Sequence, residues 1–397
     1  MKIVLVNKFW YARGGAERVV LLTKELLEKA GHTVEVFGMN HPDNLFSNKY
    51  FIDNIEYNQG SFWQKIKFGL KAIYNLDAAR NFEKLLQDFA PDVVHFHNIY
   101  HQLSCSIVGV AKKMNIKTVM TLHDYKFISP NYNLFHHGKI DESCIDGQYY
   151  RCVLNNCMEN MPESFLATIE AYFVRFKKYK QMINKFISPS HFLRDKFIKA
   201  GFLDNTIEYL PNPLPDKNFE FADSDDGYLL YVGRLSAEKG VQYLVESAKI
   251  LSNIKFKIVG TGLDKQNIEE NLQKHNIKNV ELLGWQNGEV VNDLIKKARI
   301  VVVPSVWYEN APLSVLEAKA HGKIIIASNL GGMSELLPND LLVEPSNTLI
   351  LVKKIEQWFA CSQEVRQQKA HSLYNEVCQQ NTGANYLEKL LSIYSGL

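Results

Sequence analysis

The chain has few of the features that mark membrane, secreted or disulfide-linked proteins. No stretch reaches the roughly 18 consecutive apolar residues that a membrane-spanning helix needs. The apolar run Ile3–Val6 is too short for the core of a signal peptide. Six cysteines are scattered over 397 residues, which argues against disulfides in a reducing compartment. We therefore expect a cytoplasmic protein.

Charges of the two signs nearly balance, because 45 Lys and Arg oppose 43 Asp and Glu and the formal net charge is only +2. Its distribution is uneven. Residues 1–200 hold 26 Lys and Arg against 19 Asp and Glu, a net of +7, and the remainder has a net of −5. A basic first half suggests an anionic partner such as a membrane surface, a phosphate-bearing lipid or an acidic sugar, although a surface accident explains it equally well.

Short apolar runs alternate with amphipathic helical patterns through both halves. Val/Ile-rich runs separated by helices indicate parallel strands that are buried on both faces. We predict an α/β fold with two doubly wound, Rossmann-like domains. The predicted strands are Ile3–Val6, Thr33–Phe37, Asp92–Phe96, Thr118–Leu122, Lys185–Ile187, Tyr228–Val232, Lys255–Val259, Val280–Leu283, Ile300–Val303 and Lys323–Ala327.

A proline-rich segment, residues 210–215, followed by a polar turn, residues 222–227, marks a domain junction. We expect residues 1–214 to form an N-terminal domain and residues 215–380 to form a second domain. The last helix, within residues 381–397, is expected to pack back on the first domain. Ligands of such proteins bind at the carboxyl ends of both sheets, in the cleft between the domains.

Residues 61–75 mix aromatic and aliphatic side chains with three lysines. This pattern fits an interfacial membrane helix, which would bring the protein to the inner face of the membrane. A helix that packs on the core and exposes a basic face fits it as well, and such helices are more common.

Two cations follow the predicted strand Tyr228–Val232. Arg234 comes at the strand end, and Lys239 precedes Gly240 at a helix start. Cations at this position stabilise the negative charge that gathers on a nucleoside diphosphate as its bond to a sugar breaks. Taken alone, the same segment reads equally well as an ordinary charged surface loop.

Two glutamates eight positions apart follow the strand Ile300–Val303. Glu309 lies in the loop, and Glu317 lies in the first turns of a helix that begins near Pro312. We expect Glu317 to accept both ribose hydroxyls and Glu309 to reach the transferred sugar. The helix N-terminus offers N–H donors to phosphate or sugar oxygens, from Leu313, Ser314 and Val315. Capping or ion pairing is the plainer role for either glutamate.

Two glycine pairs follow strands, Gly14-Gly15 in the first half and Gly260 with Gly262 in the second. Paired glycines let the backbone approach a ligand closely, so we expect both loops to contact the donor. Gly14-Gly15 lacks the Gly-x-Gly-x-x-Gly spacing of a dinucleotide-binding loop.

His123 ends the predicted strand Thr118–Leu122 and is expected to hydrogen-bond a sugar hydroxyl. His95, His97, His101 and His123 also permit a zinc site, but no paired carboxylates accompany them. Asp223-Ser224-Asp225 resembles a manganese-binding Asp-x-Asp pattern, yet its polar surroundings favour a solvated turn. A cysteine-containing segment offers a possible structural zinc site from Asp141, Cys144, Cys152 and Cys157, while free cysteines packing a loop are the simpler interpretation.

In combination, these motifs resemble the retaining glycosyltransferases of family 4, of the bacterial surface-polysaccharide type. The likeness covers nearly the whole chain, and its motifs are Gly14-Gly15-Ala16-Glu17, Asp92–His97, His123-Asp124, Ser188-Pro189-Ser190, Pro211-Asn212-Pro213, Gly233-Arg234-Leu235-x3-Lys239-Gly240, Glu309-x7-Glu317 and Gly331-Gly332-x2-Glu335.

The resemblance implies the GT-B fold, in which two Rossmann-like domains face each other across a cleft. It implies that residues 1–214 bind the acceptor and residues 215–380 bind the nucleotide sugar. It also implies that Arg234 and Lys239 hold the diphosphate, Glu317 the ribose, and Glu309 and His123 the donor sugar, without a metal or other cofactor. One departure is Pro312, where many members have glycine, because proline removes a backbone donor.

The function that follows is a retaining hexosyltransferase that uses a UDP- or GDP-sugar. The acceptor would be a glycan or a lipid-linked sugar in the assembly of a surface polysaccharide or glycolipid, and no nucleic acid is expected as a partner. Two alternatives are a nucleotide-sugar epimerase of the same fold and a non-catalytic carbohydrate-binding scaffold. The epimerase would release free nucleotide without an acceptor, and the scaffold would bind no nucleotide.

Overall fold

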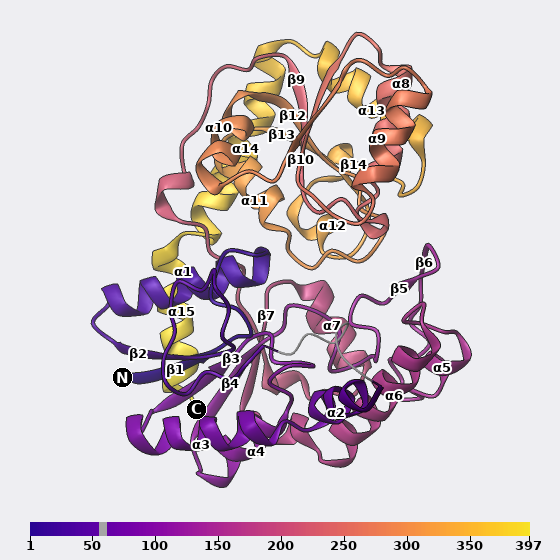
Figure 1. Ribbon diagram of the computed structural model, residues 1–397. Helices are drawn as coiled ribbons and strands as arrows, with labels where there is room; N and C mark the ends of the chain where they lie inside the picture. The colour runs from indigo at the N-terminus through magenta and orange to yellow at the C-terminus, as the bar shows by residue number, and fades with distance from the viewer. Residues whose placement is uncertain (55–61) are drawn as a thin grey trace. The chain divides into compact units, whose positions relative to one another are not determined.

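The computed structural model describes residues 1–54 and 62–397, except for the side chains of residues 62–67. The chain divides into two compact units (Figure 1). Unit 1 comprises residues 1–137, 141–211 and 386–397, and unit 2 comprises residues 138–140 and 212–385. The end of the chain therefore belongs to the unit that the beginning of the chain builds.

The sheet of unit 1 is parallel, with strands in the order β2-β1-β3-β4-β7-β8. The chain moves outward from β1 in one direction to β2 and in the other to β3. This reversal between β1 and β3 is a topological switch point, where the loops at the carboxyl ends of the strands diverge and leave room for a ligand. The strands are β1 (Lys2–Val6), β2 (Thr33–Phe37), β3 (Val93–Phe96), β4 (Lys117–Thr121), β7 (Lys185–Ser188) and β8 (Ile207–Tyr209).

The sheet of unit 2 is also parallel, in the order β11-β10-β9-β12-β13-β14. Its switch point lies between β9 and β12, which pair directly. The strands are β9 (Tyr228–Val232), β10 (Lys255–Val259), β11 (Val280–Gly284), β12 (Ala298–Val303), β13 (Ile324–Ser328) and β14 (Leu342–Val343).

All ten predicted strands are present, and their bounds differ from the prediction by at most two residues. The predicted doubly wound α/β architecture is confirmed. The strands β8 and β14 were not predicted, and neither were the two-residue strands β5 (Phe135–His136) and β6 (Lys139–Ile140). All four are too short to show an apolar run or a clear alternation in the sequence.

The helices follow the strands in the alternating order that a parallel sheet requires, since each crossover needs a connection long enough to return along the sheet. In unit 1 they are α1 (Gly15–Lys29), α2 (Phe62–Ile73), α3 (Leu76–Phe89), α4 (Ser106–Lys113), α5 (Arg151–Leu154), α6 (Met161–Phe176) and α7 (His191–Lys199). The remaining helices are α8 (Val241–Ile250), α9 (Lys265–Lys274), α10 (Gly288–Lys297), α11 (Leu313–Ala320), α12 (Met333–Leu336), α13 (Thr348–Ala360), α14 (Gln363–Gln380) and α15 (Gly383–Ser395).

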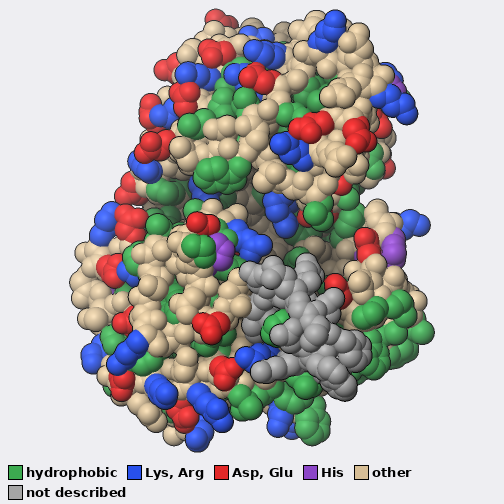
Figure 2. Space-filling view, in the orientation of Figure 1, with side chains coloured by type: hydrophobic (Ala, Val, Ile, Leu, Met, Phe, Trp, Pro, Cys, Tyr) green, Lys and Arg blue, Asp and Glu red, His purple; other side chains and the backbone are tan. Residues whose placement is uncertain are grey.

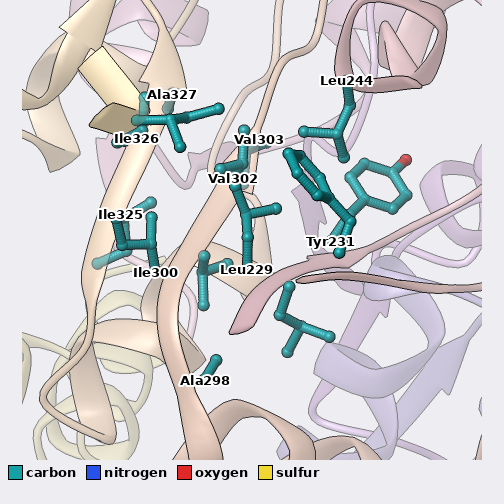
Figure 3. Close-up of a cluster of buried hydrophobic side chains, with 14 of the residues drawn as sticks. Leu229, Tyr231, Leu244, Ala298, Ile300, Val302, Val303, Ile325, Ile326 and Ala327 are labelled. Carbon is teal, nitrogen blue, oxygen red and sulfur yellow. The ribbon is translucent and has the colours of Figure 1, made fainter. Parts of the chain in front are cut away.

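Each unit has its own apolar core. In unit 2, side chains of adjacent strands such as Leu229, Val302 and Ile325 are fully buried and cluster with Leu244 of α8 (Figure 3). Every residue of β13 is buried, as expected for a strand covered by helices on both faces. These two cores hold the carboxyl ends of their strands rigidly, so the loops that follow them are well positioned.

The last helix, α15, packs on the core of unit 1 through Tyr386, Leu390 and Tyr394. The hydroxyl groups of its two tyrosines form hydrogen bonds with residues that are distant in the sequence. The Tyr386 hydroxyl bonds with Thr23 Oγ1 at 3.0 Å, and the Tyr394 hydroxyl bonds with His95 Nδ1 at 2.7 Å. Burial raises the pKa of Tyr386 to about 12, so its hydroxyl stays protonated at neutral pH.

We expect Tyr394→Phe to lower the free energy of unfolding by about 1–3 kcal/mol, because His95 would keep a buried ring nitrogen without its partner. Chemical denaturation of the full chain measures this. Tyr74→Phe is the matched control, since that ring is 38% exposed and should change stability by less than about 0.5 kcal/mol. Equal stability of the two variants would contradict the conclusion that the hydrogen bond between Tyr394 and His95 stabilises the packing of α15 on unit 1.

The predicted membrane-contacting segment, residues 61–75, is only partly described. Residue 61 and the side chains of residues 62–67 lie outside the described part. In the remainder, Leu70 and Tyr74 are exposed. No helix in the described part of the chain is long and apolar enough to cross a membrane.

Candidate functional site

The candidate site of unit 2 is built by the two loops that leave the switch point. The loop after β9 carries Arg234 and Lys239, and the loop after β12 carries Glu309. Because β9 and β12 are hydrogen-bonded neighbours, residues some 70 positions apart in the sequence emerge side by side. Sequence spacing alone does not give this proximity.

Lys239 and Glu309 form the central contact of the site. Lys239 Nζ lies 2.6 Å from Glu309 Oε1, and both side chains are largely buried. The same carboxylate oxygen accepts hydrogen bonds from Ser305 Oγ at 2.7 Å and Trp307 Nε1 at 2.9 Å. The Lys239 ammonium also lies over the Trp307 ring, 4.8 Å from its centre. Four contacts thus fix the carboxylate and the ammonium relative to each other.

These contacts determine the charge state of Glu309. Burial alone raises the pKa of a carboxyl group, but the adjacent Lys239 ammonium and the hydrogen bonds from Lys239, Ser305 and Trp307 outweigh it. The pKa of Glu309 is consequently lowered, and the group is a carboxylate at neutral pH. A carboxylate in this position is a strong acceptor for sugar hydroxyls.

Arg234 is the more accessible cation of the pair. Its side chain is 59% exposed, and its guanidinium lies 3.3 Å from Glu238 Oε1. Glu238 in turn accepts a hydrogen bond from Ser236 Oγ. The backbone of Arg234 is held by a hydrogen bond, because the Tyr231 hydroxyl donates to the Arg234 carbonyl oxygen at 2.7 Å. An exposed guanidinium on an anchored backbone is available to bind an anion.

The turn that follows Lys239 depends on Gly240. This residue has φ +68° and joins the single helical turn Ala237–Lys239 to α8. A Cβ atom there would collide with the carbonyl oxygen of Pro304, in the opposite loop. Only glycine allows this conformation together with this close approach. A Cβ atom at Gly331, in the loop after β13, would likewise collide with the backbone of Glu309, so glycines allow two neighbouring loops to pack closely against the Glu309 loop.

Glu317 lies in α11, which follows the Glu309 loop, and it is buried at 1% exposure. Pro312 is the residue before the helix and provides no side-chain cap. The Val315 N–H donates to the carbonyl oxygen of Pro312 at 3.1 Å. The first-turn donors that the helix geometry itself does not satisfy are therefore those of Leu313 and Ser314.

Gly260 and Gly262 lie in the loop after β10, the neighbour of β9. The backbone of this loop packs against the Arg234 loop, with the Leu235 N–H donating to the Thr261 carbonyl at 3.0 Å. A Cβ atom at either glycine would collide with backbone atoms of residues 233 or 235. The two glycines thus allow the loop after β10 to pack closely against the loop that carries Arg234. This packing supports the backbone of the Arg234 segment.

Unit 1 has a second cluster of predicted residues at its own switch point. Gly14 and Gly15 lie where the loop after β1 enters α1. An added Cβ at Gly14 would come within 3.2 Å of the Glu17 carboxylate. The N-terminus of α1 has no side-chain cap, so its first N–H groups remain available to an anion or a hydroxyl.

Three predicted histidines of unit 1 lie close together: His95 in β3, His97 directly after β3, and His123 just beyond the end of β4. His123 Nε2 hydrogen-bonds with His97 Nδ1 at 2.9 Å, and the rings of His95 and His97 lie 4.4 Å apart. Burial lowers the pKa of His123 to about 4 and that of His95 to about 3. At neutral pH these imidazoles are therefore uncharged hydrogen-bonding groups rather than acids.

The metal hypotheses find no support in the described part of the chain, where no three His, Cys, Asp or Glu side chains are arranged to hold an ion. Asp225 pairs instead with Arg299 at 2.8 Å and Arg366 at 3.3 Å. The expectation that the cysteines are free is wrong for Cys152 and Cys157, which form a disulfide. Their Cα atoms lie 4.9 Å apart across a tight turn, a distance within disulfide geometry.

Sequence reasoning missed the hydrogen-bonding groups around Glu309. Ser305 and Trp307 lie in the same loop, and Glu238 lies beside Lys239. Residue type does not mark Ser305 or Trp307 as a partner of Glu309, and only the fold shows that their donors converge on one carboxylate oxygen. The nearest signal in the sequence is their short separation from Glu309, which lets the loop fold back on itself.

Comparison with known families agrees with this architecture. Glycosyltransferase Family 4 matches residues 13–217, and Glycosyl transferases group 1 matches residues 215–374. Two parallel-sheet, Rossmann-like units of this kind are found in GT-B glycosyltransferases. Because the first match covers half of the chain, the protein belongs to glycosyltransferase family 4.

Some of the similar proteins have an activity in their names and others do not. A protein of the Klebsiella pneumoniae cps region, named only by its mass of 42.6 kDa, is 28% identical over 87% of this chain and 90% of its own length. The Escherichia coli UDP-Gal:alpha-D-GlcNAc-diphosphoundecaprenol alpha-1,3-galactosyltransferase is 30% identical over 37% of this chain and 38% of its own. Among solved structures, Anabaena HepE in complex with UDP and glucose has a TM-score of 0.68 and 16% identity, and the match covers all of both chains.

Proposed function

We propose that this protein is a retaining glycosyltransferase that moves a hexose from a UDP- or GDP-sugar to a hydroxyl of a glycan or lipid-linked acceptor. The single observation that carries the proposal is the Lys239–Glu309 pair at the switch point of unit 2. It places a cation that suits a phosphate next to a carboxylate that suits a sugar. A nucleotide sugar presents these two groups next to each other, on either side of the bond that breaks.

The relatives support the choice of donor and acceptor class. The E. coli relative has a UDP-sugar donor and a diphosphoundecaprenol-linked acceptor in its name, and HepE binds UDP and glucose. The Klebsiella relative is encoded in a cps region. We therefore propose a role in the assembly of a cell-surface polysaccharide or glycolipid, at the cytoplasmic face of the membrane.

The proposed roles in unit 2 follow from charge and position. Arg234 and Lys239 bind the diphosphate and stabilise the charge that it gains as the leaving group. Glu317 accepts the ribose hydroxyls, and the N–H groups of Leu313 and Ser314 bind donor oxygens. Glu309 accepts hydroxyls of the hexose. Because Arg234 and Lys239 supply the positive charge, the proposed reaction needs no metal ion.

The proposed roles in unit 1 concern the sugar and the acceptor. His123 is uncharged at neutral pH and hydrogen-bonded to His97, which makes it suited to orienting a sugar hydroxyl. Gly14 and Gly15 lie at the α1 N-terminus, where an oxygen of the donor can approach the backbone. We therefore propose that unit 1 presents the acceptor.

The proposed step is a substitution at the anomeric carbon on one face of the sugar. The bond between the anomeric carbon and the β-phosphate oxygen breaks, and its electrons remain on the phosphate. The acceptor oxygen forms a bond to the same carbon from the same face, and its proton passes to the departing phosphate oxygen. No protein nucleophile is needed, and the configuration of the donor is retained.

A donor panel tests the proposed function. The purified chain is incubated with UDP- and GDP-hexoses and lipid-linked glycan acceptors, with EDTA present, and free nucleotide and product configuration are measured. We expect acceptor-dependent release of one nucleotide, an α-linked product from an α-linked donor, and undiminished turnover with EDTA. Inversion or loss of turnover with EDTA contradicts the proposed mechanism. Nucleotide release without acceptor indicates an epimerase. Absence of heat in isothermal titration of the chain with each nucleotide indicates a scaffold.

A further inference from the structure

Helix α6 (Met161–Phe176) buries three polar side chains on its inner face. Ser164, Thr168 and Glu170 are all less than 8% exposed. Glu170 Oε2 lies 2.8 Å from the buried Lys126 ammonium. Burial alone raises the pKa of a carboxyl group, but Lys126 and His101 hold the pKa of Glu170 lowered, at about 2. These polar contacts anchor the inner face of α6 to unit 1.

The outer face of the same helix is apolar. Exposed side chains recur at spacings of four, four, three and four residues, which places them in one stripe along the helix. Phe165 is 58% exposed and Phe176 is 79% exposed. The stripe consists of Met161, Phe165, Ile169, Tyr172 and Phe176. A surface helix of a globular protein normally has the opposite arrangement, so this face is expected to have a partner.

The stripe continues onto the two helices that contact α6. Leu154 of α5 is 75% exposed, and Tyr150 just before α5 is also exposed. On the other side, the rings of Tyr74 and Phe173 lie 6.2 Å apart, and Leu70 of α2 is exposed. Figure 2 shows hydrophobic side chains gathered over α5 and α6. We call the stripe together with Leu70, Tyr74, Tyr150 and Leu154 the apolar platform.

Positive charges lie at one end of the apolar platform. Arg175, Lys177 and Lys178 are exposed beside Phe176, and Lys180 follows. In the part of the chain that the structure describes, no carboxylate lies within ion-pair distance of any of these four. The described acidic residues of this region do not pair with these cations. Glu159 and Glu163 are at the opposite end of α6, and Asp146 pairs with Arg151 at 3.1 Å.

We propose that the apolar platform is a membrane-docking surface that inserts into the interfacial zone of a bilayer containing anionic lipids. Exposed Phe and Tyr with flanking Lys are the residues that suit this zone, because the rings enter the headgroup boundary while the ammonium groups meet lipid phosphates. Among the described residues, the four cations at the end of the apolar platform have no carboxylate partners, and this favours an anionic lipid surface over a protein as the partner of the platform. The proposal goes beyond the transfer reaction and does not depend on it.

Vesicle co-sedimentation of the full chain, without donor or acceptor, tests the proposal. We expect the chain to sediment with phosphatidylcholine vesicles that contain phosphatidylglycerol and to bind pure phosphatidylcholine more weakly. Phe165→Ser combined with Phe176→Ser should abolish binding. Lys177→Gln combined with Lys178→Gln should weaken it about 25-fold, since each lysine near an anionic surface contributes about fivefold. Leu263→Ser is the control, because Leu263 is 94% exposed in unit 2.

All of the substituted side chains are exposed, so thermal unfolding should be unchanged and loss of binding cannot be attributed to misfolding. Absence of binding to the anionic vesicles, or binding that survives both double substitutions, overturns the proposal. So does a dimer, seen by light scattering, that the Phe165→Ser and Phe176→Ser substitutions dissociate while vesicles are not bound. Because no sugar substrate is present, the outcome is independent of the proposed transfer reaction.

Discussion

Arg234→Ala is expected to lower kcat/KM by about a hundred- to a thousandfold while the stability of the fold is unchanged. The guanidinium contacts a leaving diphosphate in the proposed reaction, and removing one donor to developing negative charge typically costs this much. Its ion-pair partner in the structure is Glu238, and the Arg234 side chain is 59% exposed. An ion pair whose cation is open to solvent in this way contributes less than about 1 kcal/mol to stability.

The measurement is initial-rate kinetics with the donor that the panel identifies, together with thermal unfolding of the same preparation. Lys274→Ala is a matched control, because Lys274 is an exposed cation at the end of α9 in the same unit. Isothermal titration with the free nucleotide diphosphate should show weaker binding to Arg234→Ala and normal binding to Lys274→Ala. Normal turnover and normal nucleotide affinity in Arg234→Ala would falsify its proposed role.

Glu309→Gln is expected to lower the free energy of unfolding by about 3 kcal/mol. The amide keeps an oxygen for Ser305 and Trp307, so the change mainly removes the charge opposite Lys239. A buried ammonium left without its counter-charge accounts for the loss. Adding Lys239→Met to Glu309→Gln should recover part of the stability, because the unpaired charge is then gone. Neither variant should retain normal turnover.

The matched control is Glu269→Gln, which breaks an exposed pair with Lys265 and should change stability by less than about 0.5 kcal/mol. Denaturant unfolding as a function of pH adds a second measurement. The pKa of Glu309 is lowered from 4.5, so its contribution to stability is complete above that value and disappears as pH falls through the folded-state pKa. The wild type should therefore lose stability relative to Glu309→Gln on acidification. A constant difference between the two down to the acid transition would contradict the ion pair.

Much of the fold was predictable from the sequence. Val/Ile runs such as Tyr228–Val232 and Ile300–Val303 read clearly as buried parallel strands, and both are strands in the structure. Their physical basis is local, because a strand covered on both faces needs an apolar residue at nearly every position. Short strands such as β14 depend on neighbouring strands rather than on their own residues, and the sequence did not reveal them.

For the candidate site, the sequence suggests residues but not their arrangement, and the proposed roles of these residues stay predictions. The chemistry of Arg234, Lys239, Glu309 and Glu317 suggested a phosphate and sugar site before any geometry was known. The convergence of Ser305 and Trp307 on Glu309 was not predictable, and neither was the Cys152–Cys157 disulfide. Contacts of this kind depend on how a loop turns, which no residue pattern in the chain specifies.

The sequence by itself determined which side chains are available, where the strands run and to which family the motifs point, because these properties follow from residue type and short-range periodicity. Only the tertiary structure decided which loops meet. The order of the strands places β9 beside β12 and so brings Lys239 to Glu309. It also decided that α6 buries Ser164, Thr168 and Glu170 and exposes an apolar stripe, because Glu170 pairs with Lys126 in the interior of unit 1.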